Sequence, residues 1–271
     1  MHRPGLDADG FIAREGDLAR VPPAFAPVVA AARSAALETF GPRLHSAYLY
    51  GSVPRGTAVP GVSDLDMLLA LRAEPGGADR SDARRIEGSL DTRFPQIDGA
   101  GIELASTATL LSDLERYDFG WFVACLCTPL AGEDLAARLP RYRPTSLLAR
   151  ETNGDLGDLL PGWRERLERA GSEAELRALT RRVARRVVRT GFTLVMPRWG
   201  GWTSDLRESA AVFGRYYPAR RAQMLAAAEA GRTRAADRPL LGVLIGDLGP
   251  WLAAEYVRVH GRKAPRPHSS G

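Results

Sequence analysis

The stretch that decides the fold runs Leu49-Tyr50-Gly51-Ser52-Val53-Pro54-Arg55 and resumes at Ser63-Asp64-Leu65-Asp66-Met67-Leu68-Leu69. An apolar run leads into Gly51, and a second begins at Leu65. Short apolar runs bounded by glycine and proline are typical of buried strands. We therefore predict a strand over residues 46–50, a turn-rich connection over residues 53–63, and a second strand over residues 65–71.

Two carboxylates stand at the beginning of the second strand. Residues two apart on a strand point to the same face, so Asp64 and Asp66 are expected side by side. Two adjacent like charges repel each other unless a cation lies between them. Mg²⁺ prefers oxygen ligands and keeps positions for water and phosphate, so we predict a magnesium site here.

The residues between the two strands favour phosphate binding. A glycine at position 51 lets the backbone approach a ligand closely, and Ser52 adds a hydroxyl donor. Backbone N–H groups at a turn or helix start bind anions, although the P-loop pattern is absent. We expect Arg55 and Ser63 to contact the same phosphates, with simple solvation as the alternative for both.

A third carboxylate is expected from the segment Gly101-Ile102-Glu103-Leu104-Ala105, a strand candidate that could neighbour the Asp strand. A lone Glu between apolar residues is costly to bury without partners. Glu103 could ligate metal or take a proton from an attacking hydroxyl. With two ions roughly 3.5–4 Å apart, such a site could stabilise attacking and leaving oxygens. A charge on an edge strand that faces water is the alternative.

The remaining sequence predicts an α/β catalytic domain over residues 1–150 and a helical domain over residues 151–260. The first 22 residues are interpreted as a polar arm, and the basic tail 261–271 is expected to be disordered. Residues 112–140 give no clear pattern. Helices are predicted over residues 26–40, 79–90, 163–169, 172–196, 204–213, 218–230 and 240–258, with a capping box at Ser172 and Glu175.

The helix from residue 172 carries arginines four apart. Arg185 is our candidate from this row for binding polyphosphate, and a solvated helix face is the alternative. Aromatic residues further on could line an acceptor pocket or simply belong to the core. Asp205 or Glu208 could bind a cationic acceptor, although Asp205 also suits a helix start. The aromatic candidates are Trp199, Trp202, Tyr216 and Tyr217.

The chain has 271 residues, of which 45% are hydrophobic and 25% charged, with a formal net charge of +5. This composition is ordinary for a globular protein, and the positive charge suits an anionic partner. Cys125 and Cys127 are interpreted as buried free thiols. We see neither a signal peptide nor a stretch of about 20 apolar residues, so we expect a cytoplasmic protein without a membrane partner.

Gly51-Ser52, a loop of about ten residues, and then Asp64-x-Asp66 in an apolar strand resemble the DNA polymerase β-type nucleotidyltransferase superfamily. The strand with Glu103 resembles the third-acid strand of the aminoglycoside adenylyltransferase branch. This resemblance implies an α+β fold, with a small mixed β-sheet, flanking helices and a C-terminal α-helical bundle domain.

The resemblance also implies a reaction. The three acids would serve Mg²⁺ binding and catalysis, and Gly51 and Ser52 would hold the nucleotide phosphates. AMP from ATP, or NMP from another NTP, would pass to a hydroxyl of a small molecule such as an aminoglycoside, with release of pyrophosphate. Two alternatives stay open: transfer to a protein or tRNA, and a non-catalytic nucleotide-binding module. No RNA-binding motif is recognisable, and no expected acid is missing.

Overall fold

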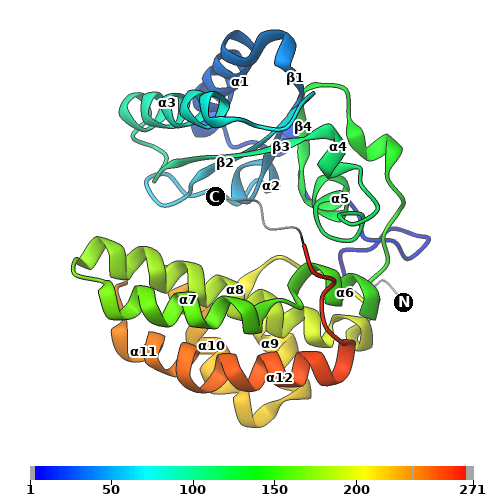
Figure 1. Ribbon diagram of the computed structural model, residues 1–271, viewed down its shortest axis with the longest axis vertical. Helices are drawn as coiled ribbons and strands as arrows, with labels where there is room; N and C mark the ends of the chain where they lie inside the picture. The colour runs from blue at the N-terminus through cyan, green and yellow to red at the C-terminus, as the bar shows by residue number, and fades with distance from the viewer. Residues whose placement is uncertain (1–3, 234, 267–271) are drawn as a thin grey trace. The chain divides into compact units, whose positions relative to one another are not determined.

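The computed structural model describes residues 4–233 and 235–266, and the chain divides into two compact units (Figure 1). The sheet unit runs from Ala13 to Tyr142. The helical unit combines the residues up to Ile12 with those from Arg143 onward. The change between units therefore falls at residue 143 rather than near 150, because the helix Ser146–Asn153 packs with other helices of the helical unit.

A four-stranded sheet forms the centre of the sheet unit, in the order β3-β2-β1-β4. Strand β2 is antiparallel to β1 and parallel to β3, and β4 is antiparallel to β1. The sheet is therefore mixed, and the predicted α+β fold with a helical C-terminal region is confirmed. The strands are β1 (Leu44–Tyr50), β2 (Leu65–Leu71), β3 (Ala100–Ser106) and β4 (Thr128–Gly132).

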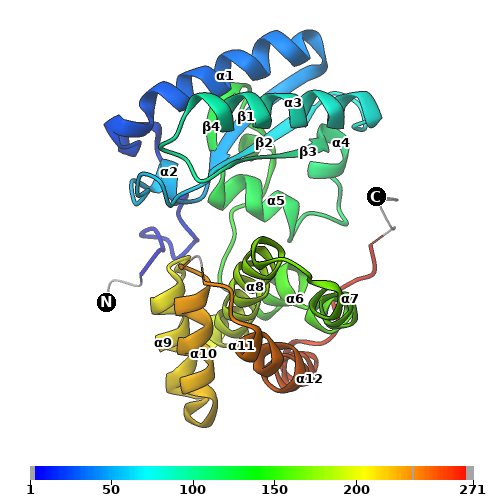
Figure 2. The same ribbon diagram turned by 90° about the vertical axis from the view of Figure 1, so that its left-hand side faces the viewer.

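Strand β2 is buried on both faces, which explains its nearly continuous apolar sequence. Leu65, Met67 and Leu69 contribute to one core with helices α1 (Ala26–Phe40) and α3 (Gly77–Arg93). Figure 2 shows these two helices side by side on one face of the sheet. On the opposite face a second core contains Tyr48, Leu68, Ala70, Ala105 and Leu110.

The outer edge of β3 is covered by carboxylates from α3. The N–H group of Ala100 donates to Asp91 Oδ1 and that of Ile102 to Glu87 Oε1, each at 2.7 Å. An edge strand presents unpaired backbone groups on which another chain can pair. Here side chains satisfy two of them, and α3 protects the edge on which Glu103 lies.

Shorter elements complete the sheet unit. The turn-rich connection begins with a single helical turn, and residues 112–140 contain short helical pieces followed by β4. Strand β4 contains Pro129, which fits an edge strand because proline cannot donate to a ladder. The short elements are η1 (Leu18–Arg20), η2 (Pro23–Phe25), η3 (Gly41–Arg43), α2 (Ser52–Arg55), α4 (Thr107–Leu110), α5 (Phe119–Trp121), the π-helical turn η4 (Phe122–Leu126) and η5 (Leu135–Arg138).

The helical unit is built around one long helix, α8. Its capping box is confirmed: Ser172 Oγ accepts the N–H of Glu175 at 3.2 Å, and Glu175 Oε2 accepts the N–H of Ser172 at 3.0 Å. The helix continues past Pro197 and ends where Gly200 turns left-handed, with φ of 72°. The helices are α6 (Ser146–Asn153), α7 (Leu156–Arg169), α8 (Glu173–Trp199), α9 (Leu206–Tyr216), η6 (Pro218–Arg220), α10 (Arg221–Ala230), α11 (Arg238–Val243), the π-helical turn η7 (Leu244–Leu248) and α12 (Gly249–His260).

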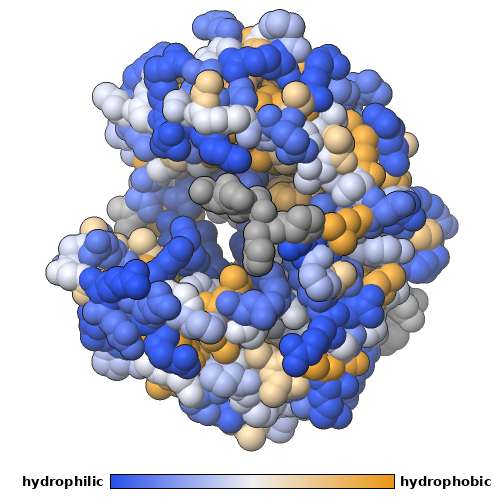
Figure 3. Space-filling model, viewed as in Figure 1, coloured by the Kyte–Doolittle hydropathy of each residue, from blue (hydrophilic) through white to orange (hydrophobic). Residues whose placement is uncertain are grey.

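Within the described residues one helical run, Arg238–His260, is long and apolar enough by length and composition to cross a membrane. This corrects our expectation that no segment comes near that length. Its buried residues recur every three or four positions, from Leu241 through Leu248 to Tyr256, as in the core helix of a globular unit. The face seen in Figure 3 is mostly hydrophilic. We interpret the run as a core helix, because a core helix can be equally long and apolar.

The first and last described residues are both fixed within the helical unit. The N–H of Trp202 donates to Pro4 O at 2.9 Å. Residues 261–266 have no regular secondary structure, but Lys263 pairs with Asp155 at 3.5 Å and Arg266 with Glu151 at 3.2 Å. The rest of the predicted disordered tail, residues 267–271, lies outside the described residues.

Candidate active site

The bend after β1 has a conformation that only glycine adopts readily. Gly51 has φ of 83° and ψ of −151°, and α2 begins at the next residue, Ser52. This region of φ/ψ space strains any residue with a Cβ. Gly56 ends the turn with φ of 76°, and the N–H of Thr57 donates to Ser52 O at 3.0 Å. The predicted strand–glycine–serine bend is therefore present.

The carboxylate of Asp66 lies between two glycines. Asp66 pairs with Tyr50 on β1 and with Gly101 on β3. A Cβ added at Gly51 would lie 2.8 Å from Asp66 Oδ2, and one added at Gly101 would lie 3.5 Å from Asp66 Oδ1. Side chains at these two positions would crowd the half-buried carboxylate, so the glycines leave it accessible.

Glu103 lies on the same face of the sheet as Asp66. In the parallel register Glu103 is opposite Leu68, and residues 66 and 68 face the same side of β2. Desolvation by neighbouring protein raises the pKa of the Glu103 carboxyl, and the charge of Arg80 partly opposes this. The residue is nevertheless exposed, on an edge strand. Glu103 and Asp66 therefore share one face of the sheet, whereas the role of Glu103 stays a prediction.

Asp64 immediately precedes β2 and is half-buried. The chain on both sides is fixed to the segment that leads into β3: Ser63 O accepts the N–H of Asp98 at 2.9 Å, and Leu65 donates to Gly99 O at 2.8 Å. The backbone is therefore fixed on both sides of Asp64. No sequence pattern indicated this support from residues 98 and 99.

Three predicted phosphate ligands have local partners. Ser63 Oγ accepts the N–H of Val59 at 2.9 Å, which closes the turn before the acid pair. Arg55 Nη1 lies 3.4 Å from Glu15 Oε2, and Arg185 Nε donates to Gly231 O at 2.9 Å. Each contact fixes the side chain locally, so phosphate binding by these three residues stays a prediction. Arg185 belongs to the helical unit, the other two to the sheet unit.

An aromatic pair next to the acids was not anticipated. The rings of Tyr50 and Phe122 meet edge to face, with centroids 4.9 Å apart. Tyr50 is paired across the ladder with Asp66, and Phe122 begins the π-helical turn η4. Both residues are only partly buried. The alternation of Tyr48 and Tyr50 in β1 was the available signal, but residues 112–140 showed no pattern that would place Phe122.

The described residues contain no group of three or more His, Cys, Asp or Glu side chains able to hold a metal ion. The three predicted acids therefore do not make a metal site by themselves. Mg²⁺ is commonly held by one or two carboxylates together with substrate phosphates. Asp64 and Asp66 fit that arrangement by their chemistry, with a nucleotide supplying the remaining oxygens.

The predicted acceptor residues have structural roles in the helical unit. Asp205 caps α9 by accepting the N–H of Glu208 at 2.8 Å, and Glu208 Oε2 accepts the hydroxyl of Thr203 at 2.6 Å. Trp199 and Trp202 pack edge to face on Phe192. Tyr216 lies under Arg198, and Tyr217 donates to Glu255 at 2.7 Å. These contacts favour the alternatives of core packing and helix capping.

No protein-family model matches the chain, and none of the curated proteins searched matches it. Among solved structures, the chain is similar to the spectinomycin adenyltransferase AAD(9) from Enterococcus faecialis, whose crystal structure was determined with ATP and spectinomycin. The TM-score is 0.50 at 12% identity, and the match covers 85% of this chain and 98% of that chain. At this identity the likeness shows the fold alone. The chain has the fold of an adenylyltransferase, as the resemblance of its motifs predicted.

Proposed function

We propose that this protein is a Mg²⁺-dependent nucleotidyltransferase that passes AMP from ATP to a hydroxyl group of a small molecule and releases pyrophosphate. The observation that carries the proposal is the position of the Asp66 carboxylate. It lies against a strand–glycine–serine bend and on the same sheet face as Glu103. Residues 51 and 101 carry no side chains, so neither would separate this carboxylate from a metal-bound nucleotide.

The carboxylates of Asp64 and Asp66 would hold Mg²⁺, which supplies charge stabilisation at the phosphate oxygens during displacement. Gly51 brings its backbone close to this position, because its conformation and missing Cβ allow the approach. Ser52 contributes its hydroxyl to the β- and γ-phosphates. Both act by binding and orienting the nucleotide.

Glu103 takes the proton of the acceptor hydroxyl in this proposal. It lies on the strand next to Asp66 and on the same face, two residues beyond Gly101. A base in that position faces a hydroxyl that approaches the α-phosphorus from the side of β3. The O–P bond to the acceptor forms as the bond to pyrophosphate breaks. The proton passes to a Glu103 carboxylate oxygen.

Two considerations favour a small-molecule acceptor. A solved structure that shares the fold was determined with ATP and a small molecule, spectinomycin. The sequence also contains no recognisable RNA-binding motif. We therefore propose a hydroxylated compound of the aminoglycoside kind before a protein or a tRNA.

The experiment supplies the protein with Mg²⁺ and each NTP labelled at the α-phosphate. Aminoglycosides, other hydroxylated metabolites, tRNA and cell protein are offered separately as acceptors. We expect label from ATP in a small molecule, and none with Asp66→Asn. Asp113→Asn is the matched control, because Asp113 is an exposed carboxylate of the same unit. Wild-type turnover by Asp66→Asn would refute the mechanism, and label only in tRNA or protein would change the acceptor.

A further inference from the structure

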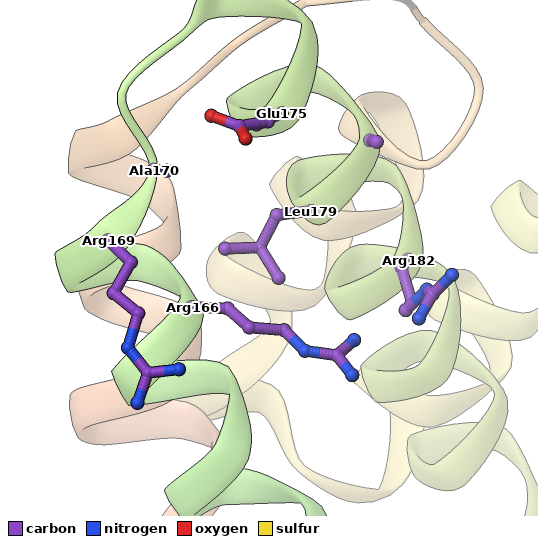
Figure 4. Close-up of a pocket in the computed structure, with 7 residues that line it drawn as sticks. Arg166, Arg169, Ala170, Glu175, Leu179 and Arg182 are labelled. Carbon is purple, nitrogen blue, oxygen red and sulfur yellow. The ribbon is translucent and has the colours of Figure 1, made fainter. Parts of the chain in front are cut away.

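The helical unit has a surface pocket of about 310 Å³ between the end of α7 and the beginning of α8 (Figure 4). All of its lining residues come from these two helices and the turn that joins them. Its volume is at the lower end of the range for small-molecule sites, so it suits a compact ligand. None of the residues predicted for the active site takes part in it.

Two unpaired guanidinium groups face this pocket. Arg166 comes from α7 and Arg182 from α8, and Figure 4 shows Arg166 reaching toward the turn of α8 that carries Arg182. Neither side chain forms a hydrogen bond or ion pair within residues 4–233 and 235–266. Nearby arginines differ in this respect: Arg169 pairs with Glu165 at 3.1 Å and Arg177 with Glu173 at 2.7 Å.

The acid that lines the pocket does not neutralise these charges. Glu175 accepts the N–H groups of Gly171 and Ser172, at 3.1 and 3.0 Å, and is thereby held in the cap of α8. Arg238 of α11 does not line the pocket, but it adds positive charge next to Ala170, which does, since it donates to Leu167 O and Ala170 O, each at 2.9 Å. It also satisfies carbonyl oxygens at the end of α7 that would otherwise repel an anion.

The pocket is apolar between its charged groups. Leu179 is 6% exposed and has its side chain directed into the pocket in Figure 4. Ala170 and Ala178 complete this apolar surface without filling it. A ligand that satisfies both parts has an anionic head and an apolar body.

We propose that this pocket binds a small organic anion, with a phosphate or carboxylate head between Arg166 and Arg182 and an apolar body against Leu179. Guanidinium groups bind both kinds of head through paired N–H···O contacts. The pocket is a second ligand site, beyond the nucleotidyl transfer proposed above. Binding here needs no nucleotide, so the inference can be tested whether or not transfer occurs.

The test titrates the full chain with phenyl phosphate and, separately, with benzoate, and calorimetry measures the binding. Inorganic phosphate and benzyl alcohol serve as probes that lack the body or the charge. We expect one of the two aromatic anions to bind more tightly than both of these, and the tighter one identifies the head group. Arg166→Gln and Arg182→Gln should each weaken binding about tenfold, as loss of a charged hydrogen bond does.

Arg164→Gln is the matched control, because Arg164 is an exposed residue of α7 that does not line the pocket. It should leave affinity unchanged. Ala178→Phe should abolish binding by filling the pocket, while the thermal transition stays in place because residue 178 is exposed. Equal affinity in the Arg164 and Arg166 variants would overturn the proposal. So would benzyl alcohol binding as tightly as the anions, or displacement of the aromatic anion by Mg²⁺ and ATP.

Discussion

The backbone of Gly51 and the carboxylate of Asp66 lie so close that a Cβ at residue 51 would be 2.8 Å from Oδ2. The contact joins the end of β1 to the start of β2, where the ladder pairs Asp66 with Tyr50, the residue before Gly51. The bend proposed to bind phosphate and the acid proposed to bind Mg²⁺ are thus positioned by one pair of strands.

Gly51→Ala should therefore lower the rate of the proposed nucleotidyl transfer by a larger factor than its loss of stability would explain. The new methyl group strains the backbone by about 1–3 kcal/mol. It also displaces the carboxylate, and a misplacement of about 1 Å costs roughly a hundredfold in rate. Gly61→Ala separates the two effects, since Gly61 has φ of 72° but a Cβ added there would meet nothing within 4 Å. We expect Gly61→Ala to lower the melting temperature and keep activity. Equal activity in both variants would contradict this assignment.

The acids that cover the edge of β3 should contribute to stability. Glu87→Ala leaves the N–H of Ile102 without its acceptor, so we expect a loss of about 1–2 kcal/mol in the free energy of unfolding. Urea denaturation measures this loss. Glu38→Ala removes an exposed carboxylate of the neighbouring helix α1 and should be nearly neutral. If both substitutions lower the free energy of unfolding equally, the contact between Glu87 and Ile102 does not stabilise the fold.

Glu255 should make stability depend on pH in the acid range. Its hydrogen bond with Arg258, helped by that with Tyr217, lowers the pKa of the carboxyl to about 2. A lowered folded-state pKa means that the stabilisation is complete above the unfolded value of about 4.3 and is lost as pH falls toward 2. Glu255→Gln should lower the melting temperature at pH 7 and flatten its decrease below pH 4.3. Glu168→Gln, at an exposed position of α7, should leave the curve unchanged.

Arg266 should stabilise the helical unit through its pair with Glu151. That carboxylate is 8% exposed and also pairs with Arg150, at 2.8 Å. Arg266→Met should cost about 1–3 kcal/mol, because it leaves a buried charge less well compensated. Arg262→Met removes an exposed arginine from the same segment and should cost little. Thermal unfolding compares the two, and equal melting temperatures would argue against a fixed terminal segment.

Where local signals were strong, sequence patterns predicted the structure closely. Strand β2 has the predicted limits of residues 65 and 71, because its apolar run is bounded by turn residues. Helix α1 likewise matches residues 26–40, and the Ser172 capping box is formed as expected. The shared face of Asp66 and Glu103 depends on the register between β2 and β3, which alternation within each strand does not determine.

Long-range contacts were beyond the sequence patterns. Strand β4 was missed because its five residues include Pro129 and Gly132, and its pairing with β1 is distant in sequence. The Arg55–Glu15 contact depends on an N-terminal segment that looked like a free arm. Helix α7 is longer than predicted, because Pro161 lies inside it and masks its beginning. No local pattern shows which partner these residues meet.

The division of the chain at residues 12 and 143 has a consequence for synthesis on the ribosome. The sheet unit is one continuous segment and can fold as soon as residue 142 has emerged. Pro4 leaves the ribosome before Trp202, whose N–H it accepts, so this part of the helical unit forms only after residue 202 has emerged. An excised fragment spanning residues 13–142 retains every strand of the sheet, whereas a fragment beginning at residue 143 lacks part of its own unit.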